Sequence, residues 1–229
     1  MTTKNTNDRN NMTKIPEKHT TYYDLLDSFK EKGCPLCFLV DRSVKAFFKS
    51  FLSELILDNG MTMRLNKSKG FCEQHGFSLL KHGDSLGTAI TYNVLVDDLL
   101  AELKKTGSVK SKFFNQEGKC PACEAYNGSD ERYTDAFVLY SGEDEFLENY
   151  KKSTGVCVPH LRKLLAKTKD KELLKKFIEL HLGFYGKLND ELLSMIRKND
   201  YRYSKEPWGT EKDAWIRVVE KFVGRQFRN

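Results

Sequence analysis

All six cysteines and two of the five histidines occur in closely spaced pairs that could bind metal ions. They form two sets, each a C-x2-C followed by a C-x2-H: Cys34, Cys37, Cys72 and His75, then Cys120, Cys123, Cys157 and His160. The spacing is nearly the same in both sets, with 34 and 33 residues between the pairs. Three thiolates and one imidazole are typical ligands of tetrahedral zinc. The spacing therefore predicts two zinc ions per chain.

The sequence around these pairs is similar in the two halves of the chain. "GCPLC" at 33–37 matches "KCPAC" at 119–123, and "SKGFCEQHGFSLLK" at 68–81 resembles "STGVCVPHLRKLLA" at 153–166. Corresponding ligands lie 86 residues apart in the C-x2-C pairs and 85 residues apart in the C-x2-H pairs. This self-similarity at a fixed offset predicts an internal duplication with a pseudo-twofold relation between the halves.

Other roles for these cysteines stay open. The same Cys3His ligands can bind an iron–sulfur cluster, which is the alternative cofactor. Oxidation of zinc-bound thiolates would also allow a redox protein or redox sensor. A single buried cysteine often packs as a small apolar residue, but six cysteines in one repeated pattern favour metal. A thioredoxin-like site would need a preceding strand, whereas the segment before Cys34 has helical spacing.

The prolines inside the C-x2-C pairs predict how the thiolates are positioned. Pro35 and Pro121 suit the first turn of a helix, where the missing N–H has no intrahelical partner. Cys34 and Cys120 then lie near helix N-caps, where free backbone N–H groups and the helix dipole stabilise a thiolate. In each C-x2-H pair, residues i and i+3 share one helical face and can bind one ion.

The remaining sequence predicts helices throughout, and we expect an all-α fold. The expected helices cover residues 35–57, 61–66, from 72 onward, 85–105, 144–151, 170–197, and from an N-cap at Thr210 to 222. Gly128 weakens the helix expected after Cys123. The helix at 85–105 is expected to bury one face, formed by Tyr92, Leu95, Val96, Leu99 and Leu103.

The helix at 170–197 has one apolar face, made of Leu174, Phe177, Ile178, His181, Tyr185, Leu188 and Leu192. We interpret His181 as a hydrogen-bonded core residue, since the cysteines all have partners elsewhere.

These elements predict two tandem helical repeats, each with its own Cys3His site, followed by C-terminal helices. The expected units are a disordered polar tail (1–18), repeat 1 (19–107), a linker (108–119), repeat 2 (120–199), and a loop with the C-terminal helix (200–229). We expect each metal site to close within its repeat. The alternative is exchange, in which the C-x2-C of one half shares an ion with the C-x2-H of the other.

Composition bounds the function without naming it. The net charge of +6 is spread along the chain, and no run of about 18 apolar residues predicts a membrane span. The polar N-terminus lacks the apolar core of a secretory signal, so we expect a cytoplasmic protein. Phosphate-binding glycine loops and common catalytic motifs are absent from the sequence, so no catalytic residue is predicted. Saturated metal sites favour a non-catalytic module that binds a protein partner.

Nucleic-acid binding is a weaker alternative. It is suggested by the net charge and by basic and aromatic residues near the C-terminus: Arg202, Arg217, Arg225, Arg228, Tyr201 and Tyr203.

On the motifs quoted above, the chain resembles a family of uncharacterised bacterial proteins, a domain of unknown function, with two copies of a pattern like CPxC followed by GFCxxH. The motifs cover Gly33 to His160. The chain departs from the pattern at Val156, which replaces the phenylalanine, and at Gly128, and neither is a proposed ligand. The resemblance implies a cytosolic, helical bacterial protein without an established activity.

Overall fold

The computed structural model describes residues 17–106, 115, 117–203 and 205–224, and every regular element in these ranges is helical, as predicted. The first half contains α1 (Thr20–Ser28), α2 (Pro35–Ser50), a π-helical turn (Phe51–Leu55), α3 (Asn59–Ser68), α4 (Glu73–Leu80) and α5 (Ser85–Thr106). The second contains α6 (Pro121–Tyr140), α7 (Asp144–Lys151), α8 (Val158–Lys167), α9 (Lys171–Lys198), a 3-10 turn (Thr210–Asp213) and α10 (Ala214–Val223). Residues 1–16 of the predicted tail (1–18), and residues 108–114 and 116 of the predicted linker (108–119), lie outside the described residues.

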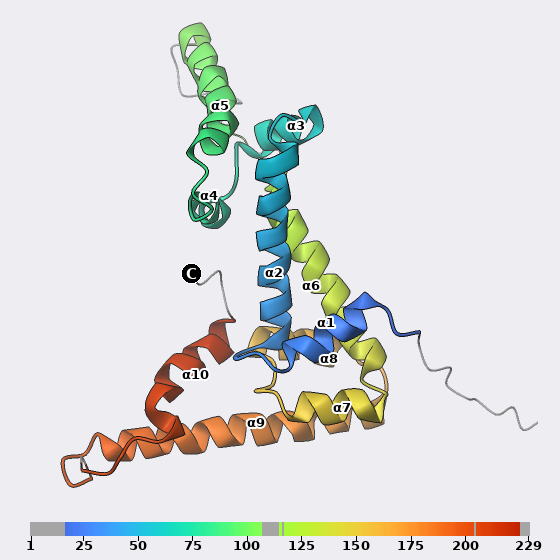
Figure 1. The fold of residues 1–229 in the computed structure, drawn as a ribbon, viewed down its shortest axis with the longest axis vertical. Coiled ribbons are helices and arrows are strands. Elements are labelled where there is room, and N and C mark those ends of the chain that lie inside the picture. The colour runs from blue at the N-terminus through green and yellow to red at the C-terminus, as the bar shows by residue number, and fades with distance from the viewer. Residues whose placement is uncertain (1–16, 107–114, 116, 204, 225–229) are drawn as a thin grey trace, which may run out of the picture.

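Helices α2 and α6 form the central, antiparallel pair of the molecule (Figure 1). Leu36 and Leu39, near the start of α2, share a core cluster with Phe137, near the end of α6. Phe48, near the end of α2, shares the other cluster with Ala122 at the start of α6. Each end of the pair therefore has its own apolar core.

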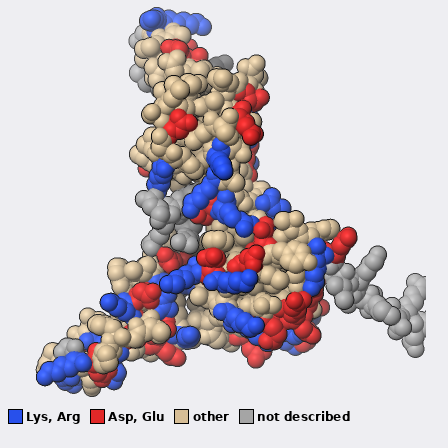
Figure 2. Space-filling view, viewed as in Figure 1, with Lys and Arg blue, Asp and Glu red and all other residues tan. Residues whose placement is uncertain are grey.

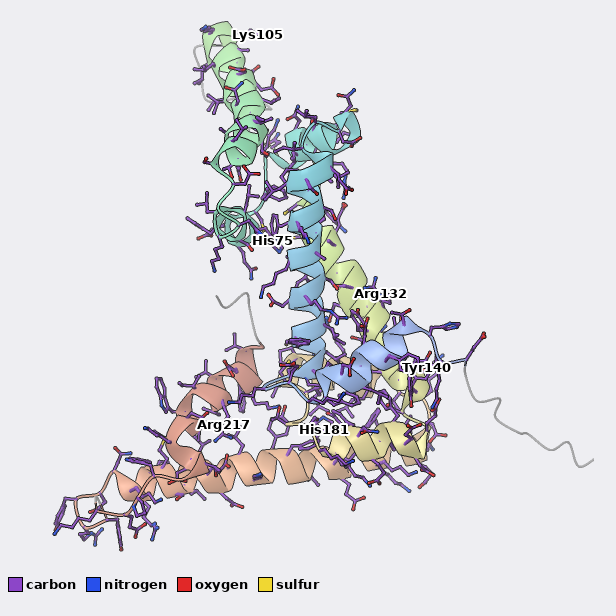
Figure 3. The ribbon with its side chains drawn as sticks, in the orientation of Figure 1. His75, Lys105, Arg132, Tyr140, His181 and Arg217 are labelled. Carbon is purple, nitrogen blue, oxygen red and sulfur yellow. The ribbon has the colours of Figure 1, made fainter. Side chains whose placement is uncertain are left out.

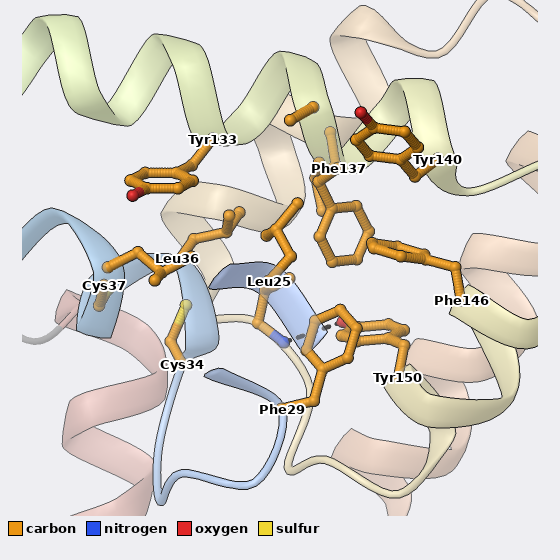
Figure 4. Close-up of a cluster of buried hydrophobic side chains, with 14 of the residues drawn as sticks. Leu25, Phe29, Cys34, Leu36, Cys37, Tyr133, Phe137, Tyr140, Phe146 and Tyr150 are labelled. Carbon is orange, nitrogen blue, oxygen red and sulfur yellow. Dashed lines mark hydrogen bonds between the residues drawn. The ribbon is translucent and has the colours of Figure 1, made fainter. Parts of the chain in front are cut away.

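Aromatic rings dominate both cores. In the cluster that joins α1, α6 and α7, the Phe137 and Tyr150 ring centroids are 4.9 Å apart and those of Phe29 and Phe146 are 5.1 Å apart (Figure 4). At the other end, Phe51 and the fully buried Phe48 pack against Phe71, with centroids 5.2 Å and 5.3 Å from it. Such edge-to-face pairs add about 0.5–1.5 kcal/mol each beyond their buried area.

Several predicted helix boundaries are confirmed by their caps. Asp58 ends the long first helix and accepts a 2.7 Å hydrogen bond from the Met61 N–H, which starts α3. Asp170 caps α9 in the same way, with a 2.8 Å bond from the Leu173 N–H. Helix α6 continues through Gly128, because the packing of its buried face outweighs the weak helix propensity of one glycine.

Two local predictions are wrong, and one residue of a predicted apolar face is exposed. In α5, Val96 and Leu103 are 50% and 43% exposed, so the predicted stripe is only partly buried, with Tyr92, Leu95 and Leu99 half-buried. Ile178 of α9 is likewise 46% exposed. Periodicity finds an apolar face, but only the tertiary fold decides whether another element covers that face. Thr210 begins a 3-10 turn instead of capping α10, and its hydroxyl donates to Glu191.

His181 is a hydrogen-bonded core histidine, as predicted. Its Nδ1 lies 2.7 Å from the Phe177 carbonyl oxygen and its Nε2 lies 2.9 Å from the Tyr150 hydroxyl. Burial lowers the pKa of His181, which keeps the ring neutral. Figure 3 shows His181 and His75 toward opposite ends of α2.

Within the described residues, no helix combines the length and apolar character that crossing a membrane requires.

Candidate metal centres

All eight predicted ligands come together in two clusters, and each cluster combines residues from both halves of the chain. The Cys34 site contains Cys34, Cys37, Cys157 and His160, and the Cys72 site contains Cys72, His75, Cys120 and Cys123. The prediction that each site closes within its own repeat is therefore wrong. The exchanged pairing, in which each C-x2-C meets the C-x2-H of the other half, is the one observed.

The length and direction of the central helices explain this exchange. From Pro35 to Leu55 the chain is helical, and at about 1.5 Å per residue it extends about 31 Å from Cys34. Helices α3 and α4 follow directly, so Cys72 lies near the end of α2, where the antiparallel α6 begins with Cys120. Closure within the half would require a return over the whole helix. Exchange needs only a short connection.

The distances within the Cys34 site are those of a compact four-ligand cluster. His160 Nδ1 lies 3.4 Å from Cys34 Sγ, 3.4 Å from Cys37 Sγ and 3.1 Å from Cys157 Sγ. The Sγ atoms of Cys37 and Cys157 are 3.6 Å apart, well beyond bonding distance, and all six cysteines of the chain are free. All four side chains are buried.

The Cys72 site has closely similar dimensions. His75 Nδ1 lies 3.2 Å from Cys72 Sγ, 3.7 Å from Cys120 Sγ and 3.3 Å from Cys123 Sγ, and the Cys72 and Cys123 sulfurs are 3.6 Å apart. Cys72 and Cys123 are only half-buried, in contrast to every ligand of the Cys34 site. The Cys72 site is thus the more accessible of the two.

Both clusters fit a tetrahedral ion. Zinc–sulfur bonds of about 2.3 Å and zinc–nitrogen bonds of about 2.0–2.1 Å at tetrahedral angles place two sulfurs about 3.8 Å apart and sulfur and nitrogen about 3.6 Å apart. The sulfur–sulfur distances of 3.6 Å and the sulfur–nitrogen distances of 3.1–3.7 Å agree with these values. The donor sets can therefore hold one metal ion each.

Every ligand pair is presented by the first turn of a helix. The four N-cap residues are cysteines: Cys34 for α2, Cys72 for α4, Cys120 for α6 and Cys157 for α8. Pro35 and Pro121 occupy the first helical positions, as predicted. None of these N-cap cysteines forms a side-chain capping hydrogen bond, but the positive end of each helix dipole lies near the sulfur atoms and favours thiolate. Here local sequence determines local geometry.

A glycine with positive φ precedes each C-x2-H pair. Gly70 has φ +89° and Gly155 has φ +74°, a region that L side chains rarely adopt. A Cβ on Gly155 would also lie 2.5 Å from Cδ2 of Phe184 on α9. Gly70 and Gly155 occupy matching positions in the two halves of the sequence, and each forms a similar turn before Cys72 or Cys157. The duplication itself stays a prediction.

Asp130 is a residue beside the Cys34 site that the sequence analysis did not identify. Its Oδ1 lies 2.7 Å from His160 Nε2, on the opposite side of the ring from the sulfurs, and its Oδ2 accepts a hydrogen bond from Lys163. Burial disfavours charge on both groups, yet hydrogen bonding lowers the pKa of Asp130 and raises that of His160 to about 12. A carboxylate in this place fixes the tautomer and orientation of a metal-binding histidine.

The position equivalent to Asp130 in the first half offers no such carboxylate. Subtracting the 86-residue offset gives Val44, which is fully buried and packs in the apolar core. A search for an acidic residue near each C-x2-C would have found Asp130, but only the packing of α6 against α8 shows that it reaches His160.

Lys221 is the second residue that the sequence analysis missed. It lies on the buried face of α10, and its Nζ donates hydrogen bonds to the Thr154 and Gly155 carbonyl oxygens, at 2.6 and 2.5 Å. Gly224, the C-cap of α10, lies beside the cluster, since a Cβ at this position would be 3.7 Å from Cys157 Sγ. Three thiolates and one divalent ion carry a net charge of −1, which a nearby ammonium group partly offsets.

The described arginines of the suggested nucleic-acid surface form ion pairs within the protein. Arg202 forms an ion pair with Asp200 at 2.6 Å, and Arg217 forms one with Glu191 at 2.6 Å. Arg225 and Arg228 lie outside the described residues. Figure 2 shows basic and acidic side chains interspersed over the visible face. The described residues thus form no continuous basic stripe in this view.

Comparison with known proteins agrees with the motif-based resemblance. The model of a family of unknown function, DUF6062, matches residues 18–229. An uncharacterised 23.9 kDa protein from the xynA 3' region of Caldicellulosiruptor sp. (strain Rt8B.4) is 28% identical over 208 residues, covering 88% of this chain and 100% of that protein. No solved structure gives a significant match. The chain is thus a member of the DUF6062 family, whose function is unknown.

Proposed function

We propose that the protein is a cytoplasmic, non-catalytic helical module that binds a protein partner and is stabilised by one zinc ion at each of its two Cys3His sites. The observation that carries this proposal is the saturation of both sites by four protein ligands. Catalytic zinc sites usually keep one position open for water or substrate, whereas structural sites do not.

The compactness of the clusters supports zinc over an iron–sulfur cluster. All donor atoms of a site lie within 4.8 Å of one another, which leaves room for one ion between them. A cluster would separate its ligands, because they bind different iron atoms with sulfide between those atoms. Among single ions, the Cys3His set is typical of structural zinc.

The placement of the sites supports a structural role. The Cys34 site joins the start of α2 to the start of α8, and the Cys72 site joins the start of α6 to the start of α4. Each ion would cross-link segments more than 40 residues apart in sequence. Such a cross-link restricts the unfolded chain and couples the free energy of metal binding to that of folding.

Metal analysis of protein purified without oxygen tests this proposal. We expect two zinc ions per chain, no visible absorption, and an X-ray absorption spectrum with three sulfur ligands and one nitrogen ligand. The double variant Cys34→Ser, Cys157→Ser should retain one ion, and so should Cys72→Ser, Cys120→Ser. A brown protein, or an exchangeable oxygen ligand at full occupancy, would refute the structural zinc assignment.

Exposed apolar side chains support partner binding. Trp215 and Phe222 of α10 are 57% and 62% exposed, and α5 exposes several leucines. Contiguous exposed apolar patches on soluble proteins often mark interaction sites. The division into repeat 1 (19–107) and repeat 2 (120–199) remains part of the proposal.

A redox sensor is the second candidate, favoured by the half-buried Cys72 and Cys123. Their sulfurs are 3.6 Å apart, so peroxide could oxidise both thiolates to a disulfide, be reduced to water and release the ion. This candidate predicts zinc release and loss of two thiols per chain at low peroxide, while the buried Cys34 site keeps its ion. Zinc retention under such treatment would refute it.

A further inference from the structure

Helix α5 exposes a regular apolar seam. Its members follow one another at alternating steps of three and four residues, and all are exposed: Leu86, Ala89, Asn93, Val96, Leu100 and Leu103. Exposure reaches 70% at Leu86 and 47% at Leu100. This alternation is the a/d pattern by which two helices pack in a coiled coil.

The α5 seam lies opposite the face by which α5 packs on the rest of the protein. Gly87 and Thr91 are buried, and a Cβ on Gly70 would lie 3.2 Å from Leu95 Cδ1, so these residues define the inner face. At about 100° per residue, the inner face lies roughly 160° around the helix from the seam. In Figure 1, α5 extends away from the central pair beyond its contact with α4.

We propose that the α5 seam is a dimerisation surface on which α5 of a second copy packs antiparallel. In this direction the seam is complementary to itself. Leu86 faces the partner's Leu103, Ala89 faces the partner's Leu100, and Asn93 faces the partner's Val96. The small side chain of Ala89 thus faces the large side chain of Leu100 in both copies, as close packing requires.

Charge selects the antiparallel direction. Lys104 and Lys105 form the basic last turn of α5, and Asp84 caps its first turn through a 2.7 Å hydrogen bond from the Gly87 N–H. Antiparallel packing places the lysines of one copy beside the partner's Asp84, and it places the negative C-terminal end of each helix dipole beside the positive N-terminal end of the other. Parallel packing would instead bring the lysines of the two copies together and pair Ala89 with the partner's Ala89.

The polar member of the seam is compatible with this packing. Asn93 Nδ2 donates a 3.0 Å hydrogen bond to Asp97 Oδ2 within its own helix. The side chain therefore does not need a second asparagine across the interface, which is the usual partner in parallel pairs. The seam extends about 26 Å, at about 1.5 Å per residue, so we expect weak association on the order of micromolar.

Sedimentation velocity of the full-length, metal-loaded protein over a range of concentrations tests the proposal. We expect a reversible monomer–dimer equilibrium in the wild type. Leu100→Glu, which buries charge twice in a symmetric dimer, should weaken dimerisation by about a hundredfold or more. Ala101→Glu is the matched control, because Ala101 is exposed on the same helix but lies off the seam, and it should leave the dissociation constant unchanged.

Photo-crosslinking tests the direction of packing. A benzophenone amino acid at position 86 should crosslink to the partner's last α5 turn, around residue 103. Crosslinking around the partner's residue 86 overturns the antiparallel arrangement. A wild type that stays monomeric at about 100 µM, about a hundredfold above a micromolar dissociation constant, overturns the interface itself. So does a dimer that Leu100→Glu does not weaken.

Zinc content is measured for every variant. The dimer goes beyond the proposed structural zinc, so a monomeric protein with two ions per chain refutes only the seam. A dimer with no metal refutes only the metal assignment.

Discussion

Replacing Asp130 by asparagine should weaken metal binding at the Cys34 site and leave the Cys72 site unchanged. The variant keeps the shape of the side chain and removes its charge. Asp130 is 4% exposed at its side chain and contacts both His160 Nε2 and Lys163 Nζ. The substitution therefore acts on the orientation and basicity of one ligand without exposing the site.

Two independent magnitudes apply to this change. Loss of a carboxylate that supports a metal-binding histidine typically lowers metal affinity about 10- to 100-fold, which equals about 1.4–2.7 kcal/mol. A buried hydrogen bond to a charged group contributes about 1.5–3 kcal/mol, which is the same range. We therefore expect a loss within about 10- to 100-fold for one of the two ions.

Competition with a chelating dye measures the two affinities, and NMR of cadmium-loaded protein assigns them. In Asp130→Asn, only one of the two cadmium resonances should shift and only one affinity should fall. The Cys72 site is the internal control, because Val44 stands where Asp130 stands in the other half. Equal affinities in variant and wild type, or an equal change at both sites, would refute the role assigned to Asp130.

Three further predictions concern stability and metal release. Gly155→Ala should lower the free energy of unfolding by about 1–3 kcal/mol or more, because φ is +74° and the new Cβ would meet Phe184. Gly128→Ala should raise the free energy of unfolding by about 1 kcal/mol, because Gly128 lies on α6 with open space around it. Urea unfolding measures both changes. A chelator should remove the first ion from the Cys72 site, because Cys72 and Cys123 are half-buried. Cys72→Ser should therefore eliminate the fast phase of metal release, and Cys34→Ser should eliminate the slow phase. Identical phases in both variants would contradict this order. Burial lowers the pKa of His181 in the folded protein, so below about pH 6.5 the unfolded chain binds a proton at this residue that the folded protein does not bind. The contribution of neutral His181 to stability is therefore fully present above about pH 6.5 and is lost as the pH falls toward the folded pKa. Unfolding of His181→Gln from pH 7 to 5 should depend less steeply on pH than that of the wild type, and equal slopes would argue against a neutral His181.

Local features of the site could be predicted from the sequence because they depend on neighbouring residues. Pro35 and Pro121 each occupy the first position of a helix, and the cysteine before each proline is its N-cap. Steric restriction by the proline ring and the missing N–H determine this without tertiary contacts. The eight candidate ligands, the helical class and most helix ranges follow from local spacing of the same kind.

Contacts between distant segments decided what the sequence left open. Whether Cys34 shares its ion with His75 or with His160 depends on the antiparallel packing of α2 and α6, which no local pattern encodes. Asp130 and Lys221 reach the Cys34 site only because α6 and α10 pack beside α8. The exposure of the α5 seam has the same origin, since an apolar stripe on a helix is identical in sequence whether the fold covers it or leaves it for another chain.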